Sequence, residues 1–202
     1  MPLSQKDIEE STTIVSQIGI APIVELLKQK ADVILCGRAC DTAIYAAPCI
    51  YNGYNPGLAF HMAKIMECGA MCSEPVAAAD VMQAYMYDDY FELRPANPIR
   101  KCTVDRVAAH TLYEQSNPYL IFEPDGVCDL TNSEFQQVDE RTVRVTGSVF
   151  KEAEQPTLKL EGVKCSGYRT ICPATIYDPE TIRQFDTIAN TVMNFVKENT
   201  QK

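Results

Sequence analysis

The feature that most constrains this fold is the stretch Ala31-Asp-Val-Ile-Leu-Cys-Gly-Arg-Ala-Cys-Asp41. Four apolar residues, Val33 to Cys36, follow one another without the polar alternation of a half-exposed strand. Such a run is typical of a strand covered on both faces, as the strands of parallel sheets are. Gly37 then permits a sharp exit from the strand, and Asp41 can cap the helix that follows. We therefore predict an α/β fold organised around this strand.

The residues before this strand predict helices that would flank a sheet. Ser4 and Asp7 have the spacing of a helix start, and apolar residues repeat at helical spacing as far as Ile18. Pro22 suits the first turn of a second helix. A helix followed by a strand is half of a βαβ unit, so we expect residues 1–80 to form an α/β portion with an incomplete sheet. Further chain or a partner would supply the missing strands.

From residue 81 onward the pattern changes to that of antiparallel strands. Alternating or β-branched runs predict strands at residues 90–94, 135–138, 142–146, 157–161 and 167–171. Asp178 and Pro179 then open a final helix with a stripe of apolar residues that we expect to be buried. The predicted fold class is therefore α/β, a partial parallel sheet with flanking helices, followed in residues 81–202 by a mixed α+β region with antiparallel strands packed on it.

The composition argues against several classes of binding partner. The 202 residues carry a net charge of −9, with 46% hydrophobic and 22% charged residues. An acidic chain argues against non-specific binding to nucleic acid or to an anionic membrane, and no run approaches the roughly 18 apolar residues of a membrane helix. A small anionic molecule needs only a local pocket of positive charge. Nine scattered cysteines and no secretory segment predict free thiols and a cytoplasmic location.

Gly37, Arg38 and Asp41 form the leading candidate site. Ligands of open parallel sheets collect beyond the carboxyl ends of the strands, and these residues would lie there. The Arg38 guanidinium suits a carboxylate or a phosphate, and the free N–H groups of the following helix favour the same anion. In the alternative interpretation, Arg38 and Asp41 pair with each other and only hold the turn.

The chain has two histidines that could move protons near neutral pH. His110 and Glu114 are four residues apart, so on a helix they would share a face. They are either an acid–base pair or a helix-surface pair. His61 lies beside the apolar face of a helix that we expect from Asn55 to Gly69, where a hydrogen-bonded histidine at the edge of the core is the commoner arrangement.

Metal and thiol chemistry have weaker support. Three residues separate Cys36 from Cys40, whereas two are typical of zinc knuckles, so we predict no metal site. Cys40 would lie near a helix start and Arg38, which lower a thiol pKa, although packing in the core is the default for it. The sequence does not identify a cofactor, so any cofactor stays unknown. Two basic segments, residues 94–101 and the strand holding Arg169, could add to an anion pocket or form surface salt bridges.

Several stretches together resemble the acyclic terpene utilisation (AtuA-like) family, and they occur in the family's order over nearly the whole chain. They are Ala31 to Asp41, Met66-Glu-Cys-Gly-Ala70, Ala108-Ala-His-Thr-Leu-Tyr-Glu114, Arg141-Thr-Val-Arg-Val-Thr-Gly-Ser148, Lys159-Leu-Glu-Gly162 and Gly167-Tyr-Arg-Thr-Ile171. Family members are typically longer and carry an amino-terminal α/β portion with a glycine-rich turn. The resemblance therefore implies the carboxyl-terminal part of the family's core region, and a role in the bacterial catabolism of branched acids or their acyl-CoA derivatives.

These observations favour an enzyme, or part of one, that acts on a small carboxylate or acyl-CoA by acid–base chemistry of a lyase or hydratase kind. Asp41, His110 and Glu114 are the catalytic candidates. Gly37, Arg38 and Arg169 are the candidates for binding substrate. The alternative is a non-catalytic subunit or assembly module of a larger complex. In either case we expect a homo-oligomer, or a partner chain that supplies the missing α/β portion.

Overall fold

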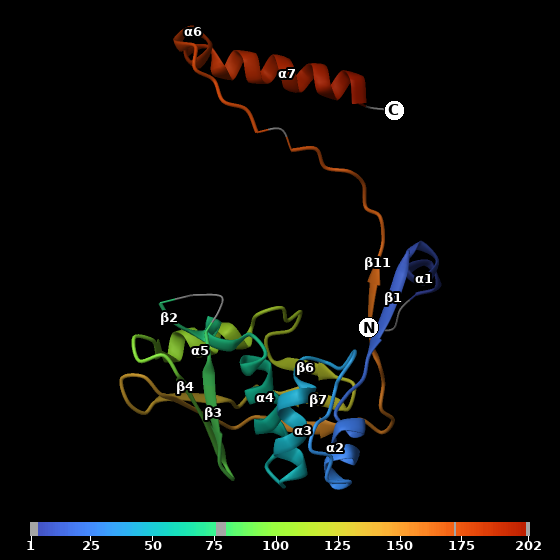
Figure 1. The fold of residues 1–202 in the computed structure, drawn as a ribbon, viewed down its shortest axis with the longest axis vertical. Coiled ribbons are helices and arrows are strands. Elements are labelled where there is room, and N and C mark those ends of the chain that lie inside the picture. The colour runs from blue at the N-terminus through green and yellow to red at the C-terminus, as the bar shows by residue number, and fades with distance from the viewer. Residues whose placement is uncertain (1–3, 76–79, 172, 201–202) are drawn as a thin grey trace. The chain divides into compact units, whose positions relative to one another are not determined.

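The computed structural model describes residues 4–75, 80–171 and 173–200. The chain forms two compact units, Met1–Lys164 and Cys165–Lys202. Helices occupy Gln5–Glu10 (α1), Ala21–Lys28 (α2), Ala43–Tyr51 (α3), Pro56–Met66 (α4), Val104–Thr111 (α5), Pro179–Arg183 (α6) and Phe185–Thr200 (α7), with a 3₁₀ turn at Gly69–Cys72 (η1). Figure 1 shows their arrangement along the chain.

The strands are short and lie mainly in the second half of the first unit. They are Thr13–Gln17 (β1), Ser73–Glu74 (β2), Met82–Met86 (β3), Tyr90–Pro95 (β4), Lys101–Cys102 (β5), Leu120–Glu123 (β6), Gly126–Asp129 (β7), Glu134–Gln137 (β8), Val143–Thr146 (β9), Val149–Glu152 (β10) and Lys159–Val163 (β11). Within the described residues they form sheets of order β3-β4-β9-β8, β10-β7-β6, β1-β11 and β2-β5. Every pairing between these strands is antiparallel.

Helix α4 is the centre of the first unit, between the two larger sheets. Asn55 caps it, accepting a bond from the Gly57 backbone N–H at 2.8 Å, and Pro56 fills its first position. Every residue from Gly57 to Ile65 is buried. Leu58, Met62 and Ile65 pack against β3, β4 and β9, whereas Ala59, Phe60 and Ala63 pack against β6 and β7. A helix that is buried all round positions its polar residues precisely because its neighbours leave them few rotamers.

His61 shows how such a helix treats a polar residue. Thr111 donates its hydroxyl to the Val107 carbonyl oxygen at 3.1 Å, so it accepts from His61 Nε2–H at 3.1 Å. His61 Nδ1 then accepts from the Ser148 hydroxyl at 2.7 Å. Burial lowers the pKa of His61 to about 3. The edge-of-core interpretation of this residue therefore fits its geometry, although the ring is fully buried.

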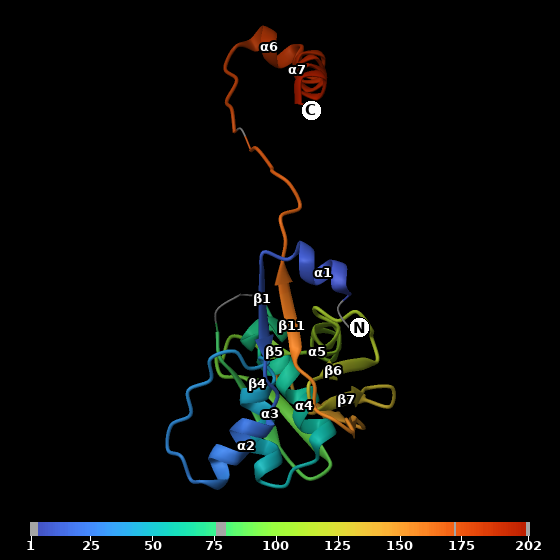
Figure 2. The same ribbon diagram turned by 90° about the vertical axis from the view of Figure 1, so that its right-hand side faces the viewer.

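The prediction of a parallel sheet around residues 33–36 is wrong. These residues form no strand, and the side chains of Val33 and Leu35 are 86% and 96% exposed. The described part of the chain holds one isolated parallel bridge, between Ile18 and Ala39. A strand inside a parallel sheet needs a neighbouring strand on each side. The nearest strand that could pair with residues 33–36 is β1, and it pairs with β11 instead. Figures 1 and 2 both show β1 and β11 side by side. The α+β mixture with antiparallel strands is confirmed.

Several local expectations also need correction. The first helix ends at Glu10, and residues 13–17 form strand β1 where helical spacing predicted more helix. Residues 167–171 form no strand. The final helix breaks at Gln184 into α6 and α7. The burial expected for its apolar stripe stays a prediction.

Other expectations are confirmed. Ser4 and Asp7 form a capping box, Pro22 lies in the first turn of α2, and β8 pairs with β9 as a hairpin. The domain boundary at residue 80 adjoins residues 76–79, which lie outside the described residues, and it stays a prediction. Elements from both sides of it pack together, since α4 contacts β10, α5 and β3. No helix in the described ranges has the length and apolar character needed to cross a membrane.

Candidate functional site

A cavity of about 300 Å³ lies in the first unit where α3 begins and α4 ends. We call it the acidic cavity. It is lined by residues of five segments that are distant in sequence: residues 40–42 before α3, the last turn of α4, residues 114–116 after α5, strand β6 and strand β11. Its charged lining residues are Asp41, Lys64, Glu67, Glu114, Glu123, Lys159 and Glu161. Five carboxyl groups thus face two ammonium groups.

Glu123 is the most perturbed carboxyl group of this cavity. Thr42 Oγ1 donates a hydrogen bond to Glu123 Oε2 at 2.9 Å. Burial raises the pKa of Glu123 to about 7, while the Thr42 bond and the Lys159 charge oppose that rise. Thr42 makes no side-chain cap bond to α3, so its hydroxyl is available for Glu123. A carboxyl group with a pKa near neutrality exchanges its proton readily at physiological pH.

Lys64 and Glu67 form an ion pair at the end of α4. The Lys64 ammonium donates to Glu67 Oε1, and both side chains are almost fully buried, at 6% and 10% exposure. Burial raises the pKa of Glu67, and the Lys64 hydrogen bond and charge counteract it. A buried pair of this kind is held in place by its surroundings, because breaking it would leave a charge without a partner. Lys159 makes no ion pair within 4.0 Å among the described residues and is the cation of the cavity that is open to a ligand.

Arg38 lies at the margin of the cavity and not in its lining. Its Nη2 donates to Glu161 Oε2 at 2.5 Å, and both side chains are about half exposed. The alternative in which Arg38 pairs with Asp41 does not describe this geometry, since the partner comes from β11. Gly37 lies in open space, where a Cβ would meet nothing within 4 Å. The structure thus brings Asp41 into the cavity and Arg38 to its edge through Glu161.

Glu114 reaches the cavity through an unusual backbone conformation. Helix α5 ends at Thr111, so Glu114 lies beyond it and does not share a helix face with His110. Glu114 has φ 57°, in the left-handed region that a residue with a Cβ seldom adopts. Such a conformation costs roughly 1 to 3 kcal/mol and is common at functional sites.

His110 lies outside the acidic cavity, in a neighbouring hollow of about 270 Å³ beside Arg106 and Tyr113. Its ring stacks on Tyr113 with centroids 5.4 Å apart. Burial, followed by the charges of Lys64 and Arg106, lowers the pKa of His110, and Glu114 acts in the opposite direction. The neighbouring Glu114 carboxylate raises the pKa of Tyr113. His110 therefore connects to the cavity through Tyr113 and Glu114.

Cys40 and Arg169 are the two remaining candidates from the sequence. Cys40 lines the cavity, but burial and the Glu123 charge raise its pKa to about 11, so it is a protonated thiol and not an activated nucleophile. Arg169 lies in the second unit, and its predicted role stays a prediction. Among the described residues no group of three or more His, Cys, Asp or Glu side chains could hold a metal ion.

Comparison with known proteins gives the family. A family model described as "Acyclic terpene utilisation family protein AtuA" matches residues 2–88 and 95–202. The chain belongs to the AtuA family. No curated protein and no solved structure matches it. The acidic cavity is built from segments on both sides of the short gap in the AtuA match, so it lies wholly within the part of the chain that shows the family.

The sequence did not predict most of the residues that line the acidic cavity. It did not single out Thr42, Lys64, Glu67, Glu123 or Lys159. One pattern could have indicated two of them, because Lys64 and Glu67 are the charged residues of the otherwise apolar helix Phe60-His-Met-Ala-Lys-Ile-Met-Glu67 and are spaced three apart. Glu123 ends a short strand before Pro124, and nothing in that pattern indicates that it faces Thr42.

Proposed function

We propose that this AtuA chain is an enzyme, or part of one, in the catabolism that its family name describes, and that the acidic cavity is its reaction site. The substrate is a small carboxylate or an acyl-CoA, and the chemistry is acid–base chemistry of a lyase or hydratase kind. The observation that carries the proposal is the Glu123 carboxyl group, held by Thr42 in a cavity that also contains Asp41 and Lys159.

The surroundings of each charged group in the acidic cavity suit it to a different role. Glu123, with a pKa of about 7, is protonated often enough to serve as the general acid. Asp41 is exposed at the cavity wall and serves as the base. Lys159 attracts the carboxylate or the thioester oxygen of the substrate. Glu114, reached from His110 through Tyr113, is a second base candidate.

In a dehydration, the base removes a proton from the carbon next to the carbonyl group. Glu123 gives its proton to the departing hydroxyl group, which leaves as water, and a carbon–carbon double bond forms. The reverse sequence adds water. A carboxyl group with a pKa of about 7 is suited to both directions, because it gives up and takes back a proton readily at neutral pH.

The experiment is a panel of small carboxylates, 3-hydroxyacyl-CoA and enoyl-CoA thioesters, tested for turnover and for stabilisation against heat. The wild-type protein, Glu123→Gln and the control Glu134→Gln are compared. Glu134 is an exposed residue of β8, so its substitution removes one carboxylate without touching the cavity. We expect turnover in the wild type and the control and a loss of about 100-fold or more in Glu123→Gln. No response of the complete, partner-bound protein to any member would contradict the proposal.

A second candidate function, a subunit or assembly module, is favoured by a different observation. Val33 and Leu35 of the first unit expose large apolar side chains that a lone chain gains nothing by exposing. This candidate includes the proposed homo-oligomer or partner chain. Light scattering across a range of concentrations separates an obligate assembly from a monomer. A cytoplasmic location belongs to either proposal, and the eight described cysteines are free thiols, as a reducing compartment keeps them.

A further inference from the structure

A cavity of about 530 Å³ adjoins the acidic cavity, between the end of β6 and the start of β11. We call it the apolar cavity and define it by the apolar residues that line it, which are Phe122, Pro124, Leu158 and Leu160. Phe122, Glu123 and Lys159 line the acidic cavity as well. The two cavities therefore meet at the groups that the proposed function uses as the acid and as the cation that attracts the substrate.

The segment before β11 is tied to the end of β6 by two hydrogen bonds. The Thr157 backbone N–H and the Thr157 hydroxyl both donate to the Pro124 carbonyl oxygen, at 2.8 and 3.3 Å. These bonds hold the two walls of the apolar cavity beside each other. The wall residues Phe122 and Leu158 are 59% and 55% exposed, so much of their apolar surface is open to a ligand. Apolar surface gathered in a hollow is typical of a site that binds an apolar group.

Strand β11 supplies side chains to both cavities. Successive side chains of a strand point to opposite faces. Lys159 and Glu161 line the acidic cavity, and Leu160, between them in the sequence, lines the apolar cavity. The Lys159 side chain borders both spaces, as does that of Glu123. An extended molecule that reaches from one cavity into the other therefore passes both of these charged groups.

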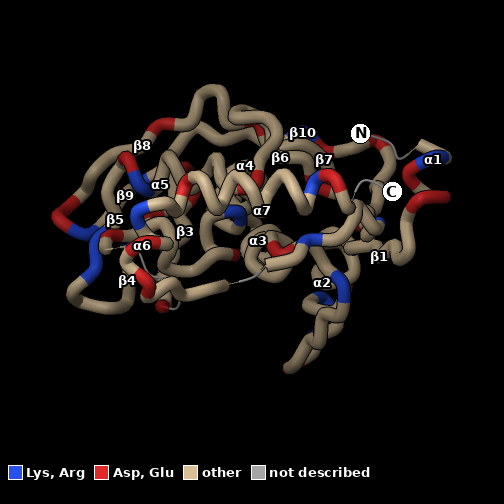
Figure 3. The backbone as a smooth tube through the Cα atoms, turned by 90° about the horizontal axis from the view of Figure 1, so that it is seen from above, with Lys and Arg blue, Asp and Glu red and all other residues tan. Residues whose placement is uncertain are grey.

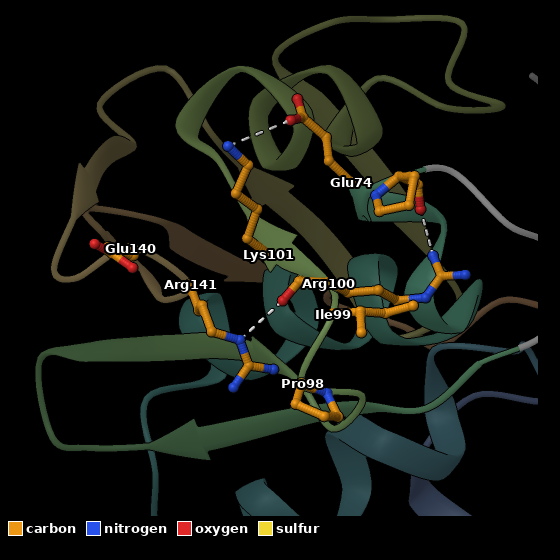
Figure 4. Close-up of a pocket in the computed structure, with 8 residues that line it drawn as sticks. Glu74, Pro98, Ile99, Arg100, Lys101, Glu140 and Arg141 are labelled. Atoms are coloured by element: carbon orange, nitrogen blue, oxygen red, sulfur yellow. Dashed lines mark hydrogen bonds and ion pairs between the residues drawn. The ribbon is translucent and has the colours of Figure 1, made fainter.

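A hollow of similar volume, about 520 Å³, lacks such an arrangement. It lies among β2, β5 and the loops that follow β4 and β8. Figure 3 shows acidic and basic residues side by side around β5 and β9. Figure 4 shows the charged ends of Arg100, Lys101 and Arg141 pointing to different sides. Asp80 pairs with Arg100, and Glu74 pairs with Lys101. These groups do not converge on one ligand, and the apolar cavity is the stronger candidate.

We propose that the apolar cavity binds the hydrocarbon chain of the substrate, and that the substrate is an acyl thioester whose carbonyl oxygen reaches Lys159. This inference rests on the proposed function and names its substrate class. A thioester fits better than a free carboxylate, because the five carboxyl groups of the acidic cavity outnumber its two ammonium groups and would repel a further negative charge. Phe122, Leu158 and Leu160 then determine which chain lengths the site accepts.

The test is calorimetry and amide chemical-shift mapping of the full chain with N-acetylcysteamine thioesters of butanoate, hexanoate and octanoate. These probes are uncharged and differ in the length of their chain. Affinity should rise by about twofold to fourfold for each added methylene group, because each one is buried against apolar side chains. The octanoyl probe should shift the amides of residues 122–124 and 157–160. Affinity that is independent of chain length, or shifts that map elsewhere, would overturn the proposal.

Leu158→Asn and Leu160→Asn each replace an apolar wall residue by a polar one of similar size. Each should weaken octanoyl binding by about threefold to tenfold and change butanoyl binding by less than about twofold. Both side chains are exposed, so neither variant should unfold the chain. Val163→Asn is the control, because Val163 is an exposed residue of the same strand that lines neither cavity. Its affinities should match those of the wild type. A dependence on chain length that persists unchanged in both leucine variants would contradict the proposal.

The binding series separates this inference from the proposed function, since binding requires no turnover. Binding that rises with chain length, without turnover of any panel member, would support the apolar cavity and count against the chemistry assigned to Glu123. Turnover with an affinity and a rate that are independent of chain length would support that chemistry and overturn the role of the apolar cavity.

Discussion

Thr42 Oγ1 lies 2.9 Å from Glu123 Oε2, and this bond joins the start of α3 to the end of β6. It favours the charged form of Glu123, against the larger effect of burial.

Replacing Thr42 by Val removes the donor and keeps the shape of the side chain. The pKa of Glu123 should then rise above its value of about 7, because burial acts without the opposing hydrogen bond. Thr42→Ser keeps the hydroxyl and is the control. Carbon-13 NMR titration of the glutamate carboxyl groups measures the shift, and an unchanged midpoint in Thr42→Val would show that the bond is not formed in solution.

The pH dependence of stability should reveal Glu123 directly. Its pKa is raised from 4.5 to about 7 in the folded chain, so between these values the folded state binds more protons than the unfolded state. The contribution of Glu123 to the free energy of unfolding is therefore fully present below pH 4.5, falls as the pH rises to 7, and is constant above that. Glu123→Gln removes this dependence and should be more stable than wild type at pH 8 by about 1 to 3 kcal/mol.

Urea unfolding of both proteins at pH 5 and pH 8 measures this difference. Glu134→Gln should unfold like the wild type at both values. A Glu123→Gln variant that is less stable than wild type at pH 8 would contradict the burial of a charged carboxyl group.

His61 should respond to pH in the opposite direction. Burial lowers its pKa from 6.5 to about 3, so between these values the unfolded state binds more protons, and stability is lost as the pH falls from 6.5 toward 3. Ser148→Ala leaves His61 Nδ1 without a donor and should destabilise the fold by about 1 to 3 kcal/mol.

Ser133→Ala is the matched control for that substitution. Ser133 contacts the Ser148 hydroxyl at 3.1 Å, so its removal leaves the bond to His61 in place and should cost less. Thermal unfolding of the two variants at pH 7 compares them. Equal losses would mean that the Ser148 hydroxyl does not serve His61 specifically.

The Arg38–Glu161 ion pair should matter for ligand binding more than for stability. Both side chains are about half exposed, so Arg38→Gln should change the free energy of unfolding by about 1 kcal/mol at most. Because Glu161 lines the acidic cavity, the same variant should alter the affinity for the ligand that the panel identifies. A double-mutant cycle with Glu161→Gln measures the pair, and a large loss of stability would assign it a structural role.

The sequence predicted local structure where local chemistry decides it. The capping box at Ser4, the helix start at Asn55 and the hairpin of β8 and β9 depend on neighbours within a few residues. The strand predicted at residues 33–36 is wrong because a strand of a parallel sheet requires neighbouring strands, which the described chain does not supply there.

The residues of the candidate site show the same contrast between local and long-range determinants. Asp41 could be singled out because it follows a glycine turn, and the structure does place it in a cavity. Glu123 could not be found, since its pKa depends on burial by segments that are distant in sequence and on a hydroxyl group 81 residues away. Packing between distant segments raises the pKa of Glu123, and the residues next to Glu123 in the sequence do not indicate that packing.

The most direct measurement is the pH dependence of turnover for wild type and Glu123→Gln, on whichever panel member the protein converts. We expect the rate of the wild type to fall with a midpoint near pH 7 as Glu123 loses its proton, and this limb to be absent from the residual rate of the variant. A limb that persists unchanged in Glu123→Gln would contradict the assignment of the reaction to this cavity.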